Sequence, residues 1–404
     1  MKAHGSFARA IVGAGCVGLV AALQSSRSAR TLLLCRASAE STPAPRLETV
    51  PAALVSLLMD FGVDPGRIGV DRLYDARHVA WESRVPMTTA GRAVAHIEHG
   101  ALQTELLAIA RRDPNLTVQI EAQLPVFRQG YWCGTSWRAK TLLDATGRAM
   151  AFATRKVHPP KPWVARPFWT QRPSAASDRS LRIAALPFGY VYRLASSRTD
   201  MLWVAGRGPH LGQSAAALER TLKEAAAGWL LEGFPPLQTA STGRAYAASL
   251  QWSEDSPCAA IGDAALARDI LSSQGLAAGI SDALYAVASQ TDGDAALCVD
   301  RQVAERAAHL RSLAQLFASC RYRDRADWLQ HSDFATRHQS APTALDGAAL
   351  VAGRVVRRAL QASAVLSAEN NDAPPKERAL THLTRRRRSA TLAENKPPNG
   401  FQHP

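Results

Sequence analysis

Residues 8–18, Ala-Arg-Ala-Ile-Val-Gly-Ala-Gly-Cys-Val-Gly, decide the fold that this sequence predicts. A short apolar run leads into Gly13, Gly15 and Gly18, and residues 19–24 continue with a helical pattern. The first glycine of such a unit permits a tight turn, the second lets the backbone approach a pyrophosphate, and the third lets helix and strand pack closely. The unit therefore predicts a dinucleotide site at a helix N-terminus, where unpaired N–H groups face the phosphates.

A second strand is predicted at residues 31–34. The acidic residue that usually binds the adenosine ribose should follow it, but Cys35 and Arg36 stand there. Glu40, or backbone and water, are the alternatives for holding the ribose. Two other interpretations of this region are a structural glycine-rich turn and a signal-peptide core at residues 10–23.

Composition excludes several classes of protein. The chain has 404 residues, of which 47% are hydrophobic, enough for a sizeable core. Six cysteines lie far apart without a C-x-x-C pair, so neither a metal site nor a disulfide framework is predicted, and a cytoplasmic location is expected. No apolar run is long enough to span a membrane. The net charge is +14, and +6 of it lies between Val351 and Pro404, so nucleic acid is not an expected partner of the body of the chain.

Periodicity predicts an α/β protein with a sheet-rich middle. Helices are predicted at residues 50–61, 100–111, 214–231, 275–289 and across 299–362, and strands at 116–120, 141–143, 181–186, 190–194 and 201–205. The expected architecture is a Rossmann-like FAD-binding domain of the glutathione reductase type, an inserted antiparallel-sheet substrate domain and C-terminal helices. The predicted ranges are 1–160 with 245–300, 60–95 with 161–244, 301–365, and a disordered basic tail at 366–404.

Two further glycine elements follow the first in a fixed order. They are Asp144-Ala145-Thr146-Gly147, and Gly262-Asp263 with the loop Ser272-Ser273-Gln274-Gly275-Leu276. Together the three elements resemble the FAD-dependent aromatic monooxygenases of the hydroxybenzoate hydroxylase and tryptophan halogenase superfamily. The resemblance covers roughly residues 8–330.

The resemblance implies FAD as the cofactor, with NADH or NADPH as electron donor and O2 as co-substrate. Asp263 is expected to accept a hydrogen bond from the ribityl chain, and the backbone of residues 274–276 to meet the flavin ring. The cofactor-binding residues it implies are Gly13, Gly15, Cys16, Val17, Gly18, Cys35, Arg36, His99, Thr146, Gly147, Gly262, Asp263, Ser273, Gln274, Gly275 and Leu276.

Halogenation is argued against by the sequence. The chemistry requires a lysine beyond the helix that Glu48 is predicted to open, and there is none between Lys2 and Lys140. The halogenase W-x-W-x-I-P signature is also missing. Residues 185–193 and 322–328 are instead similar to the monooxygenases that mature the tryptophylquinone of quinohemoprotein amine dehydrogenases, which implies a peptidyl tryptophan as substrate.

Other site residues follow from this resemblance as expectations. Glu48 and His96 are the candidate catalytic bases, each with a structural alternative as a helix charge or a buried histidine. Arg92 and Arg148 are candidates for the phosphates. Phe188, Tyr190, Tyr192, Trp203 and Trp252 are expected to line the substrate face. A small-molecule aromatic hydroxylase, and a flavin oxidase or reductase without oxygen insertion, are the alternative functions.

Overall fold

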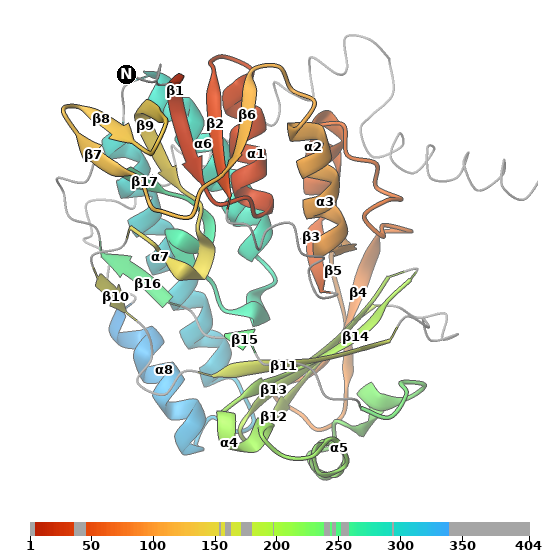
Figure 1. Cartoon of the computed structure of the whole chain (residues 1–404). Helices are drawn as coiled ribbons and strands as arrows, with labels where there is room; N and C mark the ends of the chain where they lie inside the picture. Colours follow the sequence, from red (N-terminus) through yellow and green to blue (C-terminus); the bar gives the residue numbers. More distant parts are fainter. Residues whose placement is uncertain are drawn as a thin grey trace, which may run out of the picture. The chain divides into compact units, whose positions relative to one another are not determined.

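Two β-sheets organise the protein in a computed structural model of the chain (Figure 1). The structure describes residues 5–35, 46–152, 155–157, 163–170, 180–196, 198–237, 243–244, 248–251, 258–292 and 295–338. All of them belong to one compact unit, Met1–Ala349. The predicted basic tail, Arg36, Glu40 and Trp252 lie outside the described residues, and so does the side chain of Arg92.

The first sheet has the order β6-β2-β1-β9-β8-β7, with β17 also paired to β9. Its strands are β1 (Gly5–Val12), β2 (Thr31–Cys35), β6 (Leu116–Ile120), β7 (Val126–Arg128), β8 (Tyr131–Cys133), β9 (Trp137–Asp144) and β17 (Cys258–Ala260). β6, β2, β1, β9 and β17 run parallel, and a core of buried aliphatic side chains joins them to α1 (Cys16–Ser26), α3 (His99–Ala110) and α6 (Gly275–Asp292). The predicted Rossmann-like unit is confirmed.

The second sheet has the order β15-β11-β14-β13-β12-β4-β5-β3. Its strands are β3 (Leu47–Pro51), β4 (Tyr74–Ala80), β5 (Met87–Glu98), β11 (Val164–Thr170), β12 (Leu181–Leu186), β13 (Gly189–Ala195), β14 (Asp200–Gly206) and β15 (Gly243–Arg244). The expectation of an antiparallel sheet holds with one correction, because β12 and β4 pair in parallel. Two hairpins from distant parts of the chain join there, and no tight turn fixes their relative direction.

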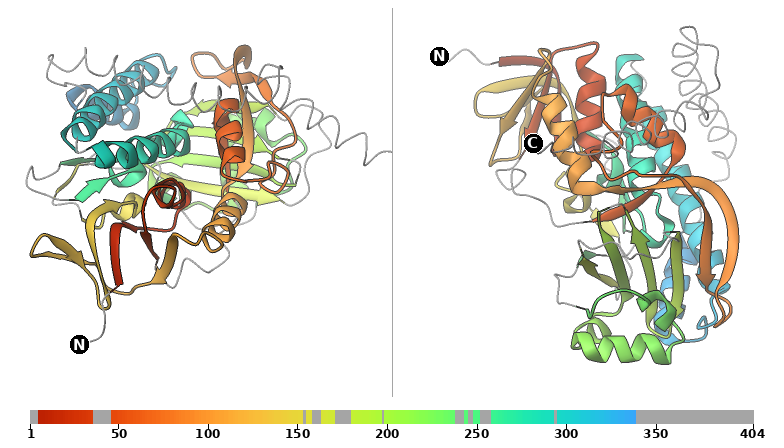
Figure 2. Two further views of the ribbon diagram at one scale, coloured as in Figure 1. Left: turned by 90° about the horizontal axis from the view of Figure 1, so that it is seen from above. Right: turned by 90° about the vertical axis from the view of Figure 1, so that its right-hand side faces the viewer.

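The chain crosses between the sheets before the first sheet is complete. β3, β4 and β5 lie in the second sheet, and β5 then leads into α3 and back to β6 (Figure 2). β3 and the end of β5 therefore lie outside the range predicted for the sheet domain. Glu48 is in β3 and not at a helix start, because α2 (Ala52–Asp60) begins only after Pro51.

Several helices are shorter than predicted or divided. The predicted helix at 214–231 consists of α5 (Ala215–Glu224) and a 3-10 turn, η3 (Gly228–Leu231), after a short α4 (Gly208–Leu211). The helical region after residue 299 consists of α7 (Ala295–Ala318) and α8 (Ala326–His338), and the remainder is outside the described residues. A small sheet, β10 (Arg155–Val157), β16 (Ala248–Gln251) and β18 (Leu266–Ala267), lies beside them.

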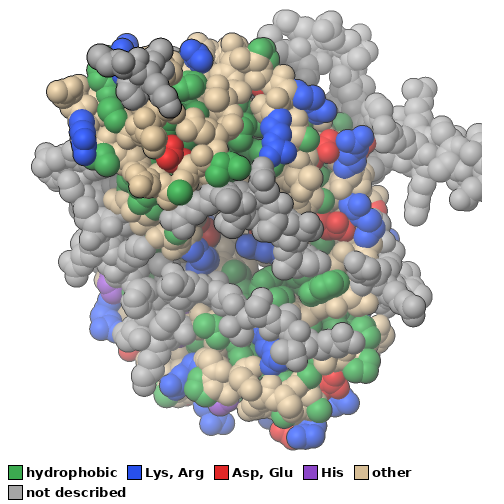
Figure 3. All heavy atoms as spheres, viewed as in Figure 1, with side chains coloured by type: hydrophobic (Ala, Val, Ile, Leu, Met, Phe, Trp, Pro, Cys, Tyr) green, Lys and Arg blue, Asp and Glu red, His purple; other side chains and the backbone are tan. Residues whose placement is uncertain are grey.

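The central strands of the second sheet have two different faces. Side chains alternate along a strand, and residues directly opposite each other on neighbouring strands share a face. One face carries Tyr190, Tyr192 and Trp203 in a core with α7 and α8, and the other packs aliphatic residues against α5. Figure 3 shows a recess between the two halves of the molecule, bordered by hydrophobic and basic side chains.

Candidate functional site

The glycine loop after β1 has the geometry that a bound pyrophosphate requires. Gly13 has a φ of +117°, and a Cβ there would lie 2.3 Å from the carbonyl oxygen of Ala145. A Cβ on Gly18 would lie 1.9 Å from the carbonyl oxygen of Gly13. Gly15, by contrast, has no atom of the described part of the chain within 4 Å of its Cβ position, so among these residues the loop is closely packed behind and open in front.

The start of α1 leaves its N–H groups available on this open side. Gly15 is the N-cap residue without a side-chain hydrogen bond, and the first turn contains no acidic residue. Four N–H groups at a helix N-terminus have no partner within the helix, and the helix dipole makes this end positive. Gln103 of α3 secures the loop by donating from Nε2 to the carbonyl oxygen of Ala14 at 2.9 Å.

Val17 of α1 packs against the turn after β17 and against α6. Its methyl groups would lie 3.1 Å from a Cβ on Gly262 and 2.7 Å from one on Gly279 of α6. Only glycine at these two places lets α1 approach α6 and the Gly262-Asp263 turn so closely. Two of the three glycine elements of the sequence therefore meet at one point.

The third element, Asp144-Ala145-Thr146-Gly147, forms a turn at the end of β9. Asp144 Oδ1 accepts hydrogen bonds from the backbone N–H of Thr146 at 2.9 Å and from its hydroxyl at 2.6 Å. Gly147 follows with a φ of +61°. The loop packs behind Gly13, so this element supports the glycine loop as well as lying beside the site.

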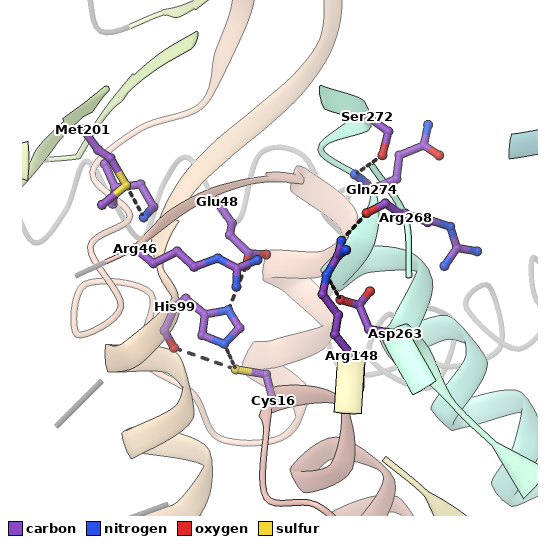
Figure 4. Close-up of polar contacts among 11 residues, drawn as sticks. Cys16, Arg46, Glu48, His99, Arg148, Met201, Asp263, Arg268, Ser272 and Gln274 are labelled. Carbon is purple, nitrogen blue, oxygen red and sulfur yellow. Dashed lines mark hydrogen bonds and ion pairs between the residues drawn. The ribbon is translucent and has the colours of Figure 1, made fainter. Parts of the chain in front are cut away.

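Asp263 is held by an arginine that comes from this turn. Arg148 Nε lies 3.1 Å from Asp263 Oδ2, and Arg148 Nη2 donates to the carbonyl oxygen of Arg268 at 2.6 Å (Figure 4). Arg148 thus binds the segment between β17 and α6 at two points, Asp263 and Arg268. Ser273, in this loop, has a φ of +49°, and Gly275 begins α6 directly afterwards.

The second strand ends in a cysteine that is not exposed. Cys35 is buried, and its thiol donates to the carbonyl oxygen of Gln119 at 3.5 Å. Glu121, which directly follows β6, donates its N–H to the carbonyl oxygen of Cys35. Its carboxylate accepts hydrogen bonds from Thr135 and Trp137, so it ties the end of β6 to the start of β9.

Four side chains from three elements converge beside the start of α1 (Figure 4). His99 Nε2 lies 3.8 Å from Cys16 Sγ, and His99 Nδ1 forms an ion pair of 2.9 Å with Glu48 Oε1. Arg46 Nη2 contacts the same Glu48 oxygen at 2.7 Å. We call Cys16, Arg46, Glu48 and His99 the Cys16–His99 cluster. Of the predicted residues, the structure brings together Cys16, Glu48 and His99.

The charges of this cluster stabilise one another. Burial would raise the pKa of Glu48, but Arg46 and His99 outweigh it and lower that pKa to about 2. The Cys16 sulfur, above all, and then Glu48 raise the pKa of His99 to about 10, against the effect of burial. Glu48 is therefore an anion and His99 a cation at neutral pH, and a carboxylate so acidic is a poor base.

A His99→Gln variant is expected to flatten the pH dependence of stability. Protonated His99 stabilises the folded state fully below pH 6.5, its ordinary pKa, and this contribution is lost as pH rises toward about 10. The free energy of unfolding of the wild type should fall over this range by more than that of the variant. Urea unfolding at a series of pH values measures the difference, and parallel curves for the two proteins would contradict it.

His96 lies apart from this cluster. The register of β3 and β5 pairs Glu48 with Ile97 and Thr49 with His96, so His96 is on the opposite face of the sheet from Glu48. Its ring is stacked on Tyr74 at 4.5 Å, and Nδ1 donates to the carbonyl oxygen of Ala195 at 2.8 Å. Burial lowers the pKa of His96 to about 4 despite that bond, so it is a neutral, structural histidine.

The aromatic residues predicted for the substrate face do not all lie on one face of the second sheet. Tyr192 lies between Tyr190 and Trp203, with ring centroids 6.5 Å and 6.2 Å apart. Phe188 is separate from this row, because it packs in the core on the α5 side and stacks on His210. Its position in the turn between β12 and β13, where alternation is interrupted, is the reason.

Two contacts at this row were not predicted. Tyr190 donates its hydroxyl hydrogen to Asp269 Oδ1 at 2.7 Å, which ties the sheet to the loop before α6. Burial raises the pKa of Asp269 to about 6, against the bonds from Tyr190 and Leu271. The second is the position of Arg46, which the sequence does not mark as a site residue. Its pKa is raised mainly by Glu48, and also by Tyr192, Asp263 and Cys16, so Arg46 lies near all four. Both residues lie in segments without a motif, so the sequence offers no signal for them.

Comparison with known proteins identifies the fold. No protein-family model and no curated protein sequence matches the chain. The myxobacterial chondrochloren halogenase CndH superimposes with a TM-score of 0.67 at 17% identity, over 81% of this chain and 86% of that one. PqsL of P. aeruginosa, in complex with 2-aminobenzoylacetate, gives 0.61 at 16% identity, over 82% and 99%. The peptidyl tryptophan dihydroxylase QhpG, essential for tryptophylquinone cofactor biogenesis, gives 0.59 at 17%, over 84% and 80%. The chain therefore has the fold that FAD-dependent halogenases and aromatic monooxygenases share.

Proposed function

We propose that this protein binds FAD and is a monooxygenase that adds oxygen to an aromatic ring. The observation that carries the proposal is the glycine loop, which is closed behind Gly13 and Gly18 and open in front of Gly15 at an uncapped helix N-terminus. This arrangement fits an anionic dinucleotide because backbone N–H groups and the helix dipole both favour a phosphate there.

The other cofactor contacts follow from the same geometry. The pyrophosphate would be held at Gly15 and Cys16, and the Asp263 carboxylate, oriented by Arg148, would accept from a ribityl hydroxyl. Residues 274–276 would present the N-terminus of α6 to the flavin ring. FAD supplies the reaction of O2 with electrons from NADH or NADPH. The chain's own residues orient the cofactor and the ring to be oxidised, and exclude water.

The substrate face favours an aromatic ring without a nearby carboxylate. Arg182 and Arg193 are paired in register and share a face, and Arg193 alternates with Tyr192, so neither lies on the side of the aromatic row. Arg166 likewise alternates with Pro167, the register partner of Trp203, and donates to the carbonyl oxygens of Leu211 and Gln213.

A tryptophan within a protein meets this requirement, because its amino and carboxyl groups are in peptide bonds. Free tryptophan does not, since its carboxylate would need a cation. Among the described residues, the cation that acts on Tyr192 is Arg46, which is already paired with Glu48. We therefore propose a peptidyl tryptophan as the substrate, in the biogenesis of a tryptophylquinone cofactor of an amine dehydrogenase subunit.

Three alternatives are kept as outcomes of the test. A small-molecule aromatic hydroxylase would act on a free ring, and a flavin oxidase or reductase would add no oxygen to any substrate. Halogenation is disfavoured because residues 3–139 contain no lysine. A cytoplasmic location is part of the proposal, which the free cysteines among the described residues support.

The test is oxygen incorporation measured by mass. The full-length protein with FAD, NADH and O2 should add one or two oxygen atoms to a tryptophan-containing amine dehydrogenase subunit, and none to free tryptophan. A Trp203→Ala variant should lower the rate on the subunit by about 10-fold or more without lowering flavin content, because stacking on the row is lost.

Trp229→Ala is the matched control, because Trp229 packs on the opposite, α5 side of the sheet. It should keep the wild-type rate relative to flavin content. Oxygen added to free tryptophan would reassign the protein to small-molecule hydroxylation. Consumption of NADH with release of peroxide and no oxygenated product from any ring would identify an oxidase.

A further inference from the structure

The Cys16–His99 cluster has the arrangement of an activated nucleophile, and the proposed function uses the backbone of Cys16 but gives the contacts among these side chains no role. Cys16 Sγ, the His99 ring and the Glu48 carboxylate form a relay in which His99 contacts the sulfur with Nε2 and the carboxylate with Nδ1. A histidine cation that a carboxylate orients toward a cysteine sulfur is an arrangement that activates cysteine nucleophiles. Cys16 is also the first residue of the 11-residue helix α1, so its sulfur lies at the positive end of the helix dipole.

We propose that Cys16 is an oxidation site that controls FAD binding: hydrogen peroxide converts it to a sulfenic acid when FAD is absent, and the oxidised side chain prevents FAD from binding. This inference rests on the FAD site of the proposed function. The oxidant is hydrogen peroxide from other copies of the protein that hold FAD, because a monooxygenase that fails to transfer its oxygen atom releases hydrogen peroxide.

The cluster supplies both the nucleophile and the proton that the reaction with hydrogen peroxide needs. The Cys16 thiolate attacks one oxygen of hydrogen peroxide, so an S–O bond forms and the O–O bond breaks. Sulfur is oxidised by two electrons, and the peroxide is reduced to a sulfenic oxygen and a hydroxide. The protonated Nε2 of His99, 3.8 Å from the sulfur, supplies the proton that turns the hydroxide into water. Glu48 holds the opposite nitrogen, so the ring stays oriented.

The position of Cys16 explains both how hydrogen peroxide reaches the sulfur and why an oxidised sulfur would block FAD. The residue is 2% exposed, but it borders Gly15, whose front is open, and the His99 side chain is 23% exposed. A molecule as small as hydrogen peroxide can enter from that side while the pyrophosphate place is empty. Bound FAD would cover the same opening. An oxygen added to the sulfur would occupy the first turn of α1, where the pyrophosphate must sit.

Other cysteines of the chain provide internal controls. Burial and then Asp144 raise the pKa of Cys258, and burial raises the pKa of Cys320 to about 11. Cys258 donates to the carbonyl oxygen of Ala259, and Cys320 accepts from the Tyr322 N–H. Thiols that stay protonated react slowly with peroxide, so these two should be inert where Cys16 reacts.

The experiment is peroxide oxidation of the full-length protein, with and without FAD, trapped with dimedone and located by peptide mass. In the protein freed of FAD, Cys16 should be labelled about 10-fold or more faster than Cys258 or Cys320, and saturating FAD should remove this advantage. His99→Gln should slow labelling of Cys16 and leave the other two unchanged. Peroxide treatment before FAD should abolish FAD binding, measured by quenching of flavin fluorescence.

Cys16→Ser separates oxidation of this residue from general damage, because it should bind FAD equally well before and after peroxide. Equal labelling of the three cysteines, or unchanged FAD binding after Cys16 has gained an oxygen, would overturn the inference. The assay contains neither aromatic substrate nor electron donor. Its failure is therefore distinct from failure of the proposed oxygen transfer, which the mass assay on the subunit reports.

Discussion

A Gly15→Ala variant is expected to fold normally and to bind FAD about 100-fold more weakly, because the second glycine of the loop must let the backbone approach the pyrophosphate. The added methyl group would meet no atom of the described residues within 4 Å, apart from its chain neighbours, so none of these residues opposes it. It would instead occupy the space in front of α1 where the phosphates dock. Titration of the FAD-free protein with FAD, followed by flavin fluorescence, measures the affinity.

Gly18→Ala is the matched control with the opposite expectation. Its methyl group would lie 1.9 Å from the carbonyl oxygen of Gly13, so α1 or the loop must move. This change should lower the free energy of unfolding by about 1–3 kcal/mol, as overpacking in a well-packed site does. If Gly15→Ala bound FAD as tightly as the wild type, the dinucleotide would not lie in front of this loop, and the proposed cofactor site would be wrong.

An Arg193→Leu variant is expected to lose about 3–5 kcal/mol of folding free energy, the cost of leaving a buried charge without its partner. Arg193 and Asp200 pair through Nε–Oδ1 at 2.9 Å and Nη2–Oδ2 at 2.5 Å, and their side chains are only 6% and 1% exposed. Arg193 also donates to the carbonyl oxygens of Leu230 and Glu232, so the chain after η3 loses its attachment to β13. Urea unfolding of the FAD-free protein measures the loss.

Arg67→Leu tests whether burial of the ion pair causes the large loss of stability expected for Arg193→Leu. Arg67 pairs with Glu105 at 3.2 Å, but its side chain is 69% exposed, and exposed pairs contribute less than about 1 kcal/mol. An Arg193→Leu, Asp200→Leu double variant should be more stable than the Arg193→Leu single variant, since no unpaired charge remains. Equal losses for Arg67→Leu and Arg193→Leu would contradict this account of the sheet.

The fold could be predicted from local patterns because its glycine elements impose local geometry. The turn after β1 needs a positive φ at Gly13 and no Cβ at Gly18, and these demands appear directly in the sequence as a spacing. β12, β13 and β14 were predicted within one or two residues, because β-branched and aromatic runs between turn residues are strong strand signals. Glu48 was placed wrongly in a helix because β3 passes into α2 at Pro51 without a break in the apolar pattern.

The candidate site was predictable only in part. Motif residues such as Gly15 and Asp263 lie where the spacing indicates, since each is fixed by its own turn. His96 and Phe188 were assigned to a site that the structure turns them away from. Alternation along a strand gives two faces but not which of them meets the neighbouring domain, and that choice depends on how the two sheets pack.

The sequence by itself determined the dinucleotide loop, the strands β12, β13 and β14, and the absence of a lysine where halogenation needs one. Only the tertiary structure decided that Cys16, Glu48 and His99 form one relay, that Tyr190 is bound to Asp269, and that three arginines of the second sheet lie away from the aromatic row. The physical reason is the separation along the sequence of the residues that interact. Backbone turns are set by neighbouring residues, whereas Cys16 and His99 are 83 residues apart and meet only when α1 and α3 pack on the same sheet.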